Sequence, residues 1–188
     1  MELSDQDAVR QTLTDRHMFR ILVQRYQDAL LRYIQRLGCS DPEIAKDILQ
    51  ESFIKAYSNL NDYDSEYAFS TWIYRIAHNE TMTYFRKQKN RPQSVKDASS
   101  LYLFDEIPTD LDTARETDTK LTREAVAAAL GKLKAQYRDV LILRFFEEKT
   151  YDEIGSILRL PHGTVATYMA RGKADLKELL KKHALTDV

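Results

Sequence analysis

Residues 70–87, STWIYRIAHNETMTYFRK, combine four aromatic side chains with three basic ones and a single acid. Unpaired bases stack on aromatic rings while their phosphates meet cations, so this composition is typical of a surface that holds a single nucleic-acid strand. Asn79 lies inside the segment, and its amide, which carries both a donor and an acceptor, could read a base edge. The simpler interpretation is that the rings are core residues at helical spacing, and the pattern alone leaves both open.

A second stretch that could bind nucleic acid runs from residue 150 to residue 182. Thr150 and Glu153 have the spacing of a capping box, which predicts that a short helix begins there. Leu160 and Pro161 are expected to close a turn after it. The next helix is expected to bury one apolar stripe, namely Val165, Met169, Leu176 and Leu180. This order of elements is typical of a helix-turn-helix.

The second helix of this pair would present its other face to a major groove. That face carries small and basic side chains, namely Thr164, Thr167, Arg171 and Lys173. Gly155 is expected where the two helices cross closely, and Ile154 and Leu158 are expected to face inward. An ordinary helical hairpin with a solvated basic end is the alternative that the pattern leaves open.

Charge is distributed unevenly along the chain, although the formal net charge is only −1. Residues 68–91 carry five basic residues and one acid, and residues 159–182 carry six basic residues and two acids. Between them, residues 92–122 carry seven acids and three basic residues. A phosphate backbone meets local charge rather than the net value, so two basic patches separated by an acidic segment are compatible with nucleic-acid binding.

The composition excludes several other classes of protein. Hydrophobic residues make up 43% and charged residues 30% of the 188 residues, which is typical of a soluble globular protein. No apolar run is long enough for insertion into a membrane, and the polar amino terminus does not resemble a signal peptide. A single cysteine, Cys39, excludes an internal disulfide bond and a cysteine zinc site. These features predict a cytoplasmic protein.

The motifs of common enzymes are absent from the sequence. His78, Asn79 and Glu80 resemble the His-x-Glu motif of zinc deaminases, but that chemistry requires paired cysteine ligands. The four histidines are too dispersed for a metal site, and neither a glycine-rich phosphate loop nor a nucleophile elbow is found. We therefore expect no catalytic residue, no metal and no cofactor.

Glycine and proline are scarce, with 5 and 4 residues, which favours an all-α protein. Apolar periodicity predicts four helices in the first half of the chain, over about residues 15–37, 41–60, 67–77 and 80–89, after a polar amino-terminal tail. Gly38 is expected to end the first helix and Asp41 to cap the second. Asn79 is expected at the break between the last two helices.

Two small helical domains joined by an acidic flexible linker account for this pattern. Residues 1–91 are expected to form the first domain, and residues 123–188 the second, which contains the helix-turn-helix. Residues 92–122 show no sustained period and carry excess acid, so this linker is expected to lack a stable fold unless a partner orders it.

Three stretches in this order resemble the extracytoplasmic-function (ECF) sigma factors, the two-domain class of bacterial transcription initiation factors. The stretch EIAKDILQESFIKAY at 43–57 is similar to the family's helix that binds core RNA polymerase. Residues 69–87 resemble the segment that melts and reads the −10 promoter element, and residues 129–180 resemble the domain that binds the −35 element. The resemblance therefore implies an all-α sigma factor whose partners are core polymerase and promoter DNA.

The resemblance also implies roles for particular residues. Core polymerase would contact Asp47, Leu49, Gln50, Glu51 and Phe53. The single-stranded −10 element would contact Trp72, Tyr74, Arg75, Asn79, Arg86 and Lys87, with Asn79 helping to hold a flipped base. The duplex −35 element would contact Thr164, Ala166, Thr167, Tyr168, Ala170, Arg171 and Lys173. An anti-sigma factor is a further partner that the family implies.

Two alanines limit what the second helix can read at the −35 element. Ala166 and Ala170 offer only methyl contacts, which suit thymine, whereas a long basic side chain can bond to guanine O6 and N7. Arg171 is then the one long cation expected to face bases. The side chains beside it that suit phosphates are Thr164, Tyr168 and Lys173. A duplex-binding regulator that never joins polymerase and a pure interaction module with a degenerate DNA surface are the alternatives.

Overall fold

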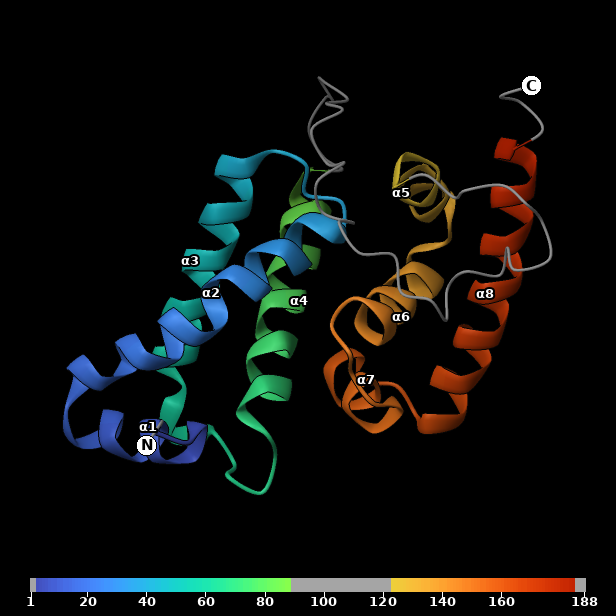
Figure 1. The fold of residues 1–188 in the computed structure, drawn as a ribbon. Helices are drawn as coiled ribbons and strands as arrows, with labels where there is room; N and C mark the ends of the chain where they lie inside the picture. The colour runs from blue at the N-terminus through green and yellow to red at the C-terminus, as the bar shows by residue number, and fades with distance from the viewer. Residues whose placement is uncertain (1–2, 89–122, 185–188) are drawn as a thin grey trace. The chain divides into compact units, whose positions relative to one another are not determined.

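The computed structural model describes residues 3–88 and 123–184 (Figure 1). The helices of the first range are α1 (Asp5–Thr14), η1 (Arg16–Met18), α2 (Phe19–Arg36), α3 (Pro42–Ser58), η2 (Leu60–Asp62) and α4 (Phe69–Gln88), where η marks a short 3-10 helix. Those of the second range are α5 (Arg123–Lys132), α6 (Ala135–Phe145), α7 (Tyr151–Leu158) and α8 (His162–Ala184). The chain divides into two compact units, which contain α1–α4 and α5–α8.

The predicted fold class, two small all-α domains, is confirmed. The described ranges contain no strand. The linker predicted at 92–122 lies outside the described residues.

Helix α2 contributes a large share of the first unit's core. The side chains that it buries recur at helical spacing, namely Leu22, Leu30, Tyr33 and Ile34. The helix begins later than predicted because Asp15 instead caps η1, where its carboxylate accepts from the His17 N–H at 3.0 Å. Gly38 follows α2 with a φ of 114°, a conformation that favours glycine, as predicted for a helix stop.

Helix α3 begins where the sequence predicts. The Asp41 carboxylate accepts hydrogen bonds from the N–H groups of Glu43 and Ile44, at 2.9 and 3.4 Å, and Pro42 occupies the first turn. These bonds satisfy two donors that a helix otherwise leaves without partners. The helix then packs along α4, and this contact closes the core of the first unit.

Helix α4 is continuous, and the predicted break at Asn79 is wrong. The sequence predicts two helices here, but one helix runs from Phe69 to Gln88. The segment contains neither glycine nor proline, so its polar run does not interrupt the backbone hydrogen bonds. Thr81 satisfies its hydroxyl inside the helix by donating to the Ala77 carbonyl at 2.8 Å. Asn79 therefore lies on an exposed face in mid-helix.

The amino-terminal residues form helix α1, although the sequence predicts a polar tail. Ser4 caps the helix by accepting from the Asp7 N–H at 3.1 Å. Two acids in the first turn complement the positive end of the helix dipole. Ala8 and Val9 are buried, so the helix is anchored by its own small apolar face, which is too narrow to register as a periodic stripe.

Helix α8 organises the second unit by packing against α5, α6 and α7. The four side chains predicted to form its inner stripe are all buried, namely Val165, Met169, Leu176 and Leu180. Gly172 lies on the same side, and a Cβ atom there would come within 3.2 Å of Leu141 Cδ1 and 3.3 Å of Tyr137 Cβ. The absence of a side chain at Gly172 therefore lets α8 approach α6 closely.

The helix-turn-helix forms as predicted, with one change in its interior. The capping box between Thr150 and Glu153 is present, so the start of α7 is confirmed. Ile154 is buried as predicted, but Leu158 is only half-buried, and Ile157 takes the inner position because it lies one turn after Ile154.

The turn between α7 and α8 explains the small residue at Gly155. Arg159 adopts the left-handed conformation, with a φ of 56°, and the N–H groups of Arg159 and Leu160 both reach the Gly155 carbonyl. A Cβ at Gly155 would lie 2.9 Å from the Leu160 carbonyl oxygen but 3.9 Å from Val165 Cγ2. Gly155 is thus required by the turn and not, as predicted from the sequence, by the crossing of the two helices.

We predict that Gly155→Ala destabilises the protein by about 1–3 kcal/mol, because the added methyl group collides with backbone that has little room to move. Gly163→Ala is the matched control, since a Cβ at Gly163 meets nothing within 4 Å and alanine is the better helix former. Urea unfolding of the two variants measures the difference. Equal stability of the two variants would contradict the proposed geometry of the turn.

Asp139 is a buried carboxylate in the second unit, on helix α6. Burial raises its pKa from 3.8 to about 6, although the Arg138 guanidinium at 3.3 Å opposes the shift. The folded state therefore holds this proton more tightly than the unfolded chain. Its contribution to the free energy of unfolding is largest below about pH 4 and is lost as the pH rises through 6.

We predict that Asp139→Asn makes the protein more stable at pH 7 by roughly 1–3 kcal/mol, because each pKa unit corresponds to about 1.4 kcal/mol. At pH 4 the variant and the wild type should differ little, since Asp139 is protonated there in the folded state. Urea unfolding at both pH values isolates this residue from other acids. A variant with the same advantage or deficit at both pH values would rule out the raised pKa.

Candidate nucleic-acid and partner surfaces

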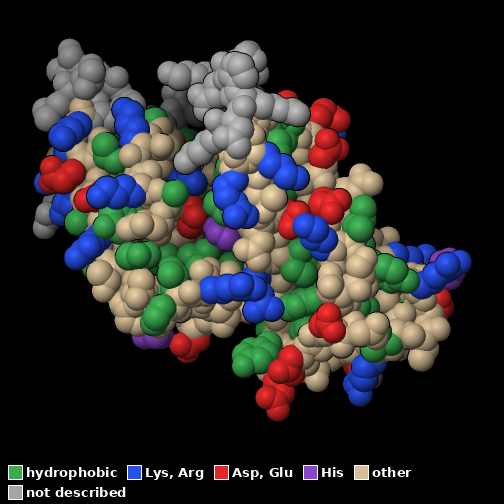
Figure 2. All heavy atoms as spheres, turned by 180° about the vertical axis from the view of Figure 1, so that it is seen from behind, with side chains coloured by type: hydrophobic (Ala, Val, Ile, Leu, Met, Phe, Trp, Pro, Cys, Tyr) green, Lys and Arg blue, Asp and Glu red, His purple; other side chains and the backbone are tan. Residues whose placement is uncertain are grey.

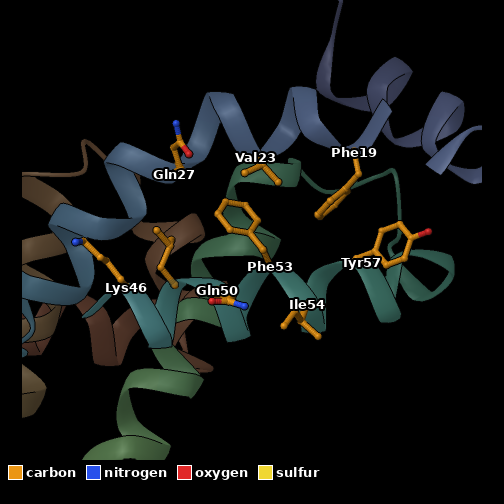
Figure 3. Close-up of a pocket in the computed structure, with 9 residues that line it drawn as sticks. Phe19, Val23, Gln27, Lys46, Gln50, Phe53, Ile54 and Tyr57 are labelled. Atoms are coloured by element: carbon orange, nitrogen blue, oxygen red, sulfur yellow. The ribbon is translucent and has the colours of Figure 1, made fainter. Parts of the chain in front are cut away.

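An apolar groove of about 460 Å³ lies between α2 and α3 (Figure 3). Aromatic rings form its floor, with the centroid of Phe19 lying 6.3 Å from that of Phe53 and 5.2 Å from that of Tyr57. Ile54 and Tyr57 remain 49% and 43% exposed beside it, which is unusual for large apolar side chains on a helix that also packs in a core. An exposed apolar groove of this kind is typical of a surface that binds a partner.

The groove coincides in part with the residues predicted to bind core polymerase. Leu49, Gln50 and Phe53 line it, although Phe53 is itself 8% exposed and contributes mainly to the core. Asp47 and Glu51 are exposed one helical turn apart and do not line the groove. The structure therefore brings together three of the five predicted residues, with two acids elsewhere on the same helix.

Sequence reasoning missed part of this groove. The residues that it did not assign are Phe19, Val23, Gln27, Lys46, Ile54 and Tyr57. Three of them come from α2, which is far enough from α3 in sequence that only the packing of the two helices brings them together. A usable signal was present in α3, where Ile54 is a large apolar residue outside the periodic set that predicts the helix.

The rings predicted to stack on bases are buried in the first unit. Trp72 packs against Tyr63 and Phe69, with centroids 5.3 and 5.6 Å away, and Tyr74 packs against Tyr33 at 5.1 Å. Trp72 and Tyr74 are 9% and 4% exposed. In this structure, neither ring offers a face to a nucleotide, so the core interpretation holds for both.

The polar residues of the same helix are on the surface. Asn79, Arg86 and Lys87 are exposed and Arg75 is half-buried one turn before Asn79. Arg86 donates to the Thr83 hydroxyl at 2.9 Å, which restrains its guanidinium near the helix. This face can therefore supply an amide and three cations.

The single acid of the segment does not offset these cations. The Glu80 carboxylate lies 2.7 Å from the Lys55 ammonium group of α3 and its side chain is only 13% exposed. The basic character that the composition indicates therefore survives on the exposed face of α4.

One exposed aromatic ring near this helix was not predicted. Tyr67 is 60% exposed in the turn that precedes α4, whereas Tyr84 and Phe85 are half-buried against each other at 5.8 Å. Tyr67 lies in the turn before α4, which begins at Phe69 and not at about residue 67 as predicted. Its signal was an aromatic residue that directly follows acids and serine.

The residues predicted for duplex binding lie along α8 with different exposures. Thr167, Ala170, Arg171 and Lys173 are exposed, and Thr164, Ala166 and Tyr168 are half-buried. The Thr167 hydroxyl donates to the Gly163 carbonyl at 2.9 Å, which leaves it as an acceptor toward a ligand. Most of the predicted set thus shares one accessible stretch of helix.

Two of these side chains are held by aromatic contacts. The Tyr168 ring packs against Tyr137, with centroids 5.6 Å apart, and is half-buried, so only part of it remains available. The Lys173 ammonium lies 4.8 Å from the centre of the Phe145 ring, a cation–π contact that restrains the side chain. Arg171 is the other long cation predicted to bind the duplex. It is exposed, and no aromatic contact of its guanidinium is found in the described residues.

Charge on the surface is interspersed with other side chains. Figure 2 shows Lys and Arg side chains spread over the face that it presents, with Asp and Glu between them and hydrophobic side chains visible among both. On the face shown, the basic side chains form no single large patch, so a polyanion there would meet local groups.

The described residues contain no cluster of His, Cys, Asp or Glu that could hold a metal ion. None of the described helices combines the length and apolar character that crossing a membrane requires.

Known protein families match both units of the chain. The Sigma-70 region 2 family matches residues 22–91, which include α3, α4 and the groove lining except Phe19, and the Sigma-70 region 4 family matches residues 123–176, which include α7 and the first part of α8. The ECF RNA polymerase sigma factor SigW of Bacillus subtilis is 33% identical over 96% of this chain and 99% of its own length. The RNA polymerase sigma-H factor of Pseudomonas aeruginosa is 30% identical over 89% of this chain and 88% of its own length.

Solved structures show the same fold. CnrH, solved in complex with the cytosolic domain of CnrY, superposes with a TM-score of 0.71 and 25% identity over 95% of this chain and 97% of CnrH. The sigma factor RpoE of Bartonella quintana, solved with the anti-sigma factor NepR, gives a TM-score of 0.67 at 21% identity over 87% and 96% of the two chains. The chain therefore belongs to the ECF family of sigma factors, alternative sigma factors that direct transcription initiation.

Proposed function

We propose that this sigma factor binds core RNA polymerase through the groove between α2 and α3, reads the unpaired −10 element with α4, and reads the duplex −35 element with α8. The single observation that carries the proposal is that each of the three segments keeps an accessible face of suitable chemistry. That face is apolar at the groove and basic at α4 and α8. A duplex-binding regulator that never joins polymerase is not favoured, because both sigma regions match in order.

The groove suits a helical surface of the polymerase. A polymerase helix in the groove would cover Ile54 and the exposed part of Tyr57, and burial of this apolar surface favours association. Asp47 and Glu51 would flank the contact and pair with basic groups of the partner, which contributes to the rate and specificity of docking. Phe53 supports the groove from below and is expected to act through packing.

The face of α4 suits a single strand. Arg75, Arg86 and Lys87 would meet phosphates, and Asn79 would present a donor and an acceptor to a base edge. Because Trp72 and Tyr74 are buried, stacking would fall to the exposed ring of Tyr67 at the amino-terminal end of the helix. Trp72 and Tyr74 would then shape the recognition surface from within.

The α8 helix suits a duplex. Arg171 is exposed and long enough to bond to a guanine edge, whereas Ala166 and Ala170 leave room for thymine methyl groups. Thr164, Tyr168 and Lys173 would fix the position of the helix on the backbone.

The remaining parts of the proposal concern partners and location. We expect the protein to act in the cytoplasm, to lack catalytic activity and to be controlled by an anti-sigma factor. The relative CnrH was solved with the cytosolic domain of a second protein, which is compatible with such control. Transcription in vitro with purified core polymerase on a pool of promoter fragments tests the function directly, and the absence of any sigma-dependent transcript would overturn it.

We predict that Ile54→Ala weakens binding to core polymerase by about ten-fold, because burial of an exposed isoleucine contributes on the order of 1–2 kcal/mol. Leu13→Ala is the matched control, since Leu13 is 53% exposed on α1 and does not line the groove. Both variants should keep the fold because neither side chain is buried. Fluorescence titration with core polymerase measures the two affinities, and equal values would show that the groove is not the polymerase-binding site.

We predict that Asn79→Ala changes the base preference of the polymerase–sigma complex for single-stranded −10 oligonucleotides, because the amide is the group in this face that can distinguish base edges. Lys87→Ala is the internal comparison, since loss of a phosphate contact should weaken all oligonucleotides alike. Competition binding at fixed salt measures both effects. An unchanged preference in Asn79→Ala would assign the reading role to another residue.

We predict that Arg171→Ala costs about 1–3 kcal/mol of −35 binding and relaxes one or two base positions. Lys173→Ala should instead weaken every sequence and reduce the salt dependence, because its charge meets phosphate. Ala166→Arg should shift the preference toward guanine at one position. Selection from randomised duplexes by the polymerase–sigma complex at fixed salt measures these changes, and a wild-type preference in Arg171→Ala would show that the recognition helix is wrongly assigned.

A further inference from the structure

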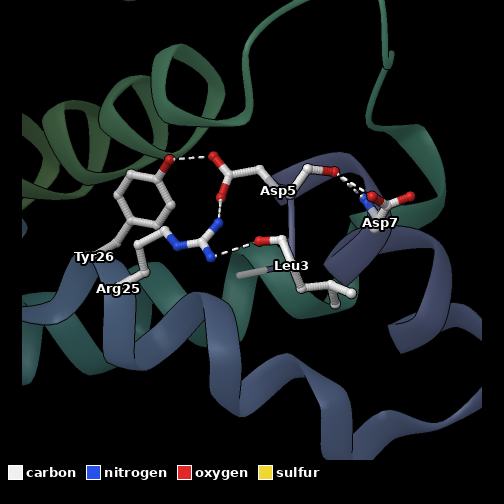
Figure 4. Close-up of polar contacts among 6 residues, drawn as sticks. Leu3, Asp5, Asp7, Arg25 and Tyr26 are labelled. Atoms are coloured by element: carbon white, nitrogen blue, oxygen red, sulfur yellow. Dashed lines mark hydrogen bonds and ion pairs between the residues drawn. The ribbon is translucent and has the colours of Figure 1, made fainter. Parts of the chain in front are cut away.

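Helix α1 takes part in none of the surfaces described above and precedes the matched sigma region, which begins at residue 22. It is nevertheless tied firmly to α2 (Figure 4). The Asp5 carboxylate accepts hydrogen bonds from the Arg25 guanidinium and from the Tyr26 hydroxyl, and Arg25 also donates to the Leu3 carbonyl at 2.7 Å. These contacts are partly buried, which makes charge-assisted bonds stronger than on an open surface.

The other side of α1 touches the connection between α3 and α4. The Gln6 side-chain amide donates to the Ser65 carbonyl at 2.9 Å, across 59 residues of sequence. Ser65 lies in the turn formed by residues 63–67. Inside that turn the Tyr63 hydroxyl donates to the Tyr67 carbonyl at 2.5 Å, and the Tyr67 N–H reaches the Asp64 carbonyl at 3.2 Å.

The same turn packs against α4. The Tyr63 ring packs against Phe69 and Trp72 of α4, with centroids 5.5 and 5.3 Å apart. Burial, together with the negative charge of Asp5, raises the pKa of Tyr63, so its hydroxyl stays protonated as the donor to Tyr67. The turn thus has two attachments, one to the core of α4 and one to α1 through Gln6.

Tyr67 is the residue that these attachments orient. Its backbone is held at both its N–H and its carbonyl, while its ring is 60% exposed. A stacking ring is useful only if its plane is fixed before the base arrives, because ordering it afterwards would cost conformational entropy. A single exposed hydrogen bond from Gln6 adds little to global stability but can restrict a local turn.

We propose that α1 is a positioning element for single-strand recognition, in which Gln6 holds the 63–67 turn so that Tyr67 is presented ready to stack at the amino-terminal end of α4. The proposal rests on the proposed function of α4. Asp5 contributes indirectly, since its bonds to Arg25 and Tyr26 hold α1 against α2. Gln6 is a positioning residue and does not itself contact DNA.

The test compares Gln6→Ala with Gln11→Ala, the same substitution at an exposed site of the same helix for which no side-chain contact is found. The full-length chain is assembled with core polymerase. The probe is a labelled single-stranded oligonucleotide carrying the −10 sequence that the wild-type complex selects from a random pool. Tyr67→Ala and the double variant Gln6→Ala/Tyr67→Ala complete a cycle that measures whether the two residues act together.

We expect Gln6→Ala to weaken oligonucleotide binding about three- to ten-fold, the range that loss of one hydrogen bond produces. Gln11→Ala should bind like the wild type, and affinity for core polymerase and the thermal midpoint should be unchanged in both. The double variant should bind no more weakly than Tyr67→Ala, because Gln6 acts through Tyr67. Hydrogen exchange of residues 60–68 should be faster in Gln6→Ala alone.

Three results would overturn the positioning role. They are equal binding by Gln6→Ala and Gln11→Ala, additive losses in the double variant, and a Tyr67→Ala variant that binds like the wild type while Asn79→Ala does not. Each of these leaves intact the proposal that α4 reads the unpaired −10 element through Asn79 and its cations. A wild-type complex that selects no single-stranded sequence would instead overturn the proposed function itself, so the two failures are distinguishable.

Discussion

Burial of one face of α4 decides which side chains are left for recognition in the first unit. Phe69, Trp72, Ile73 and Ala77 are all buried, so the aromatic rings that composition associates with single strands instead hold the unit together. An α-helix turns once every 3.6 residues, and burial of this face necessarily directs Asn79 and the late basic residues outward. The amide and the cations are thus oriented by a core that they do not enter.

The same constraint operates on α8 with different residues. Val165, Met169 and Leu176 are buried, and Gly172 allows α6 to approach, so the opposite face of the helix is the one that carries Arg171. Packing and reading are therefore coupled, because a change in the buried stripe rotates or lifts the side chains that face DNA. The groove between α2 and α3 is the exception, since there the apolar side chains themselves are left uncovered for a partner.

Local features of this structure follow from sequence because their partners lie within a few residues. The caps at Asp41 and Thr150, the stop at Gly38 and the buried stripe of α8 depend on spacings of two to four residues or on the preference of glycine for positive φ. The failures have a different origin. A break was predicted at Asn79, but the contact with α3 and an intact backbone ladder keep the helix continuous.

By itself, the sequence determined the all-α class, the helix-turn-helix, and the residue types that each recognition segment contains, since all of these are written in periodicity and composition. Only the tertiary structure decided which of those residues are accessible. Trp72 and Tyr74 are buried, Tyr67 is exposed, and three of the nine residues that line the groove come from a helix distant in sequence. The contacts that Asp5 and Gln6 of α1 make with the rest of the unit could not be predicted from the sequence either. Burial and long-range hydrogen bonds depend on how helices pack against one another, and no local pattern in the chain specifies that packing.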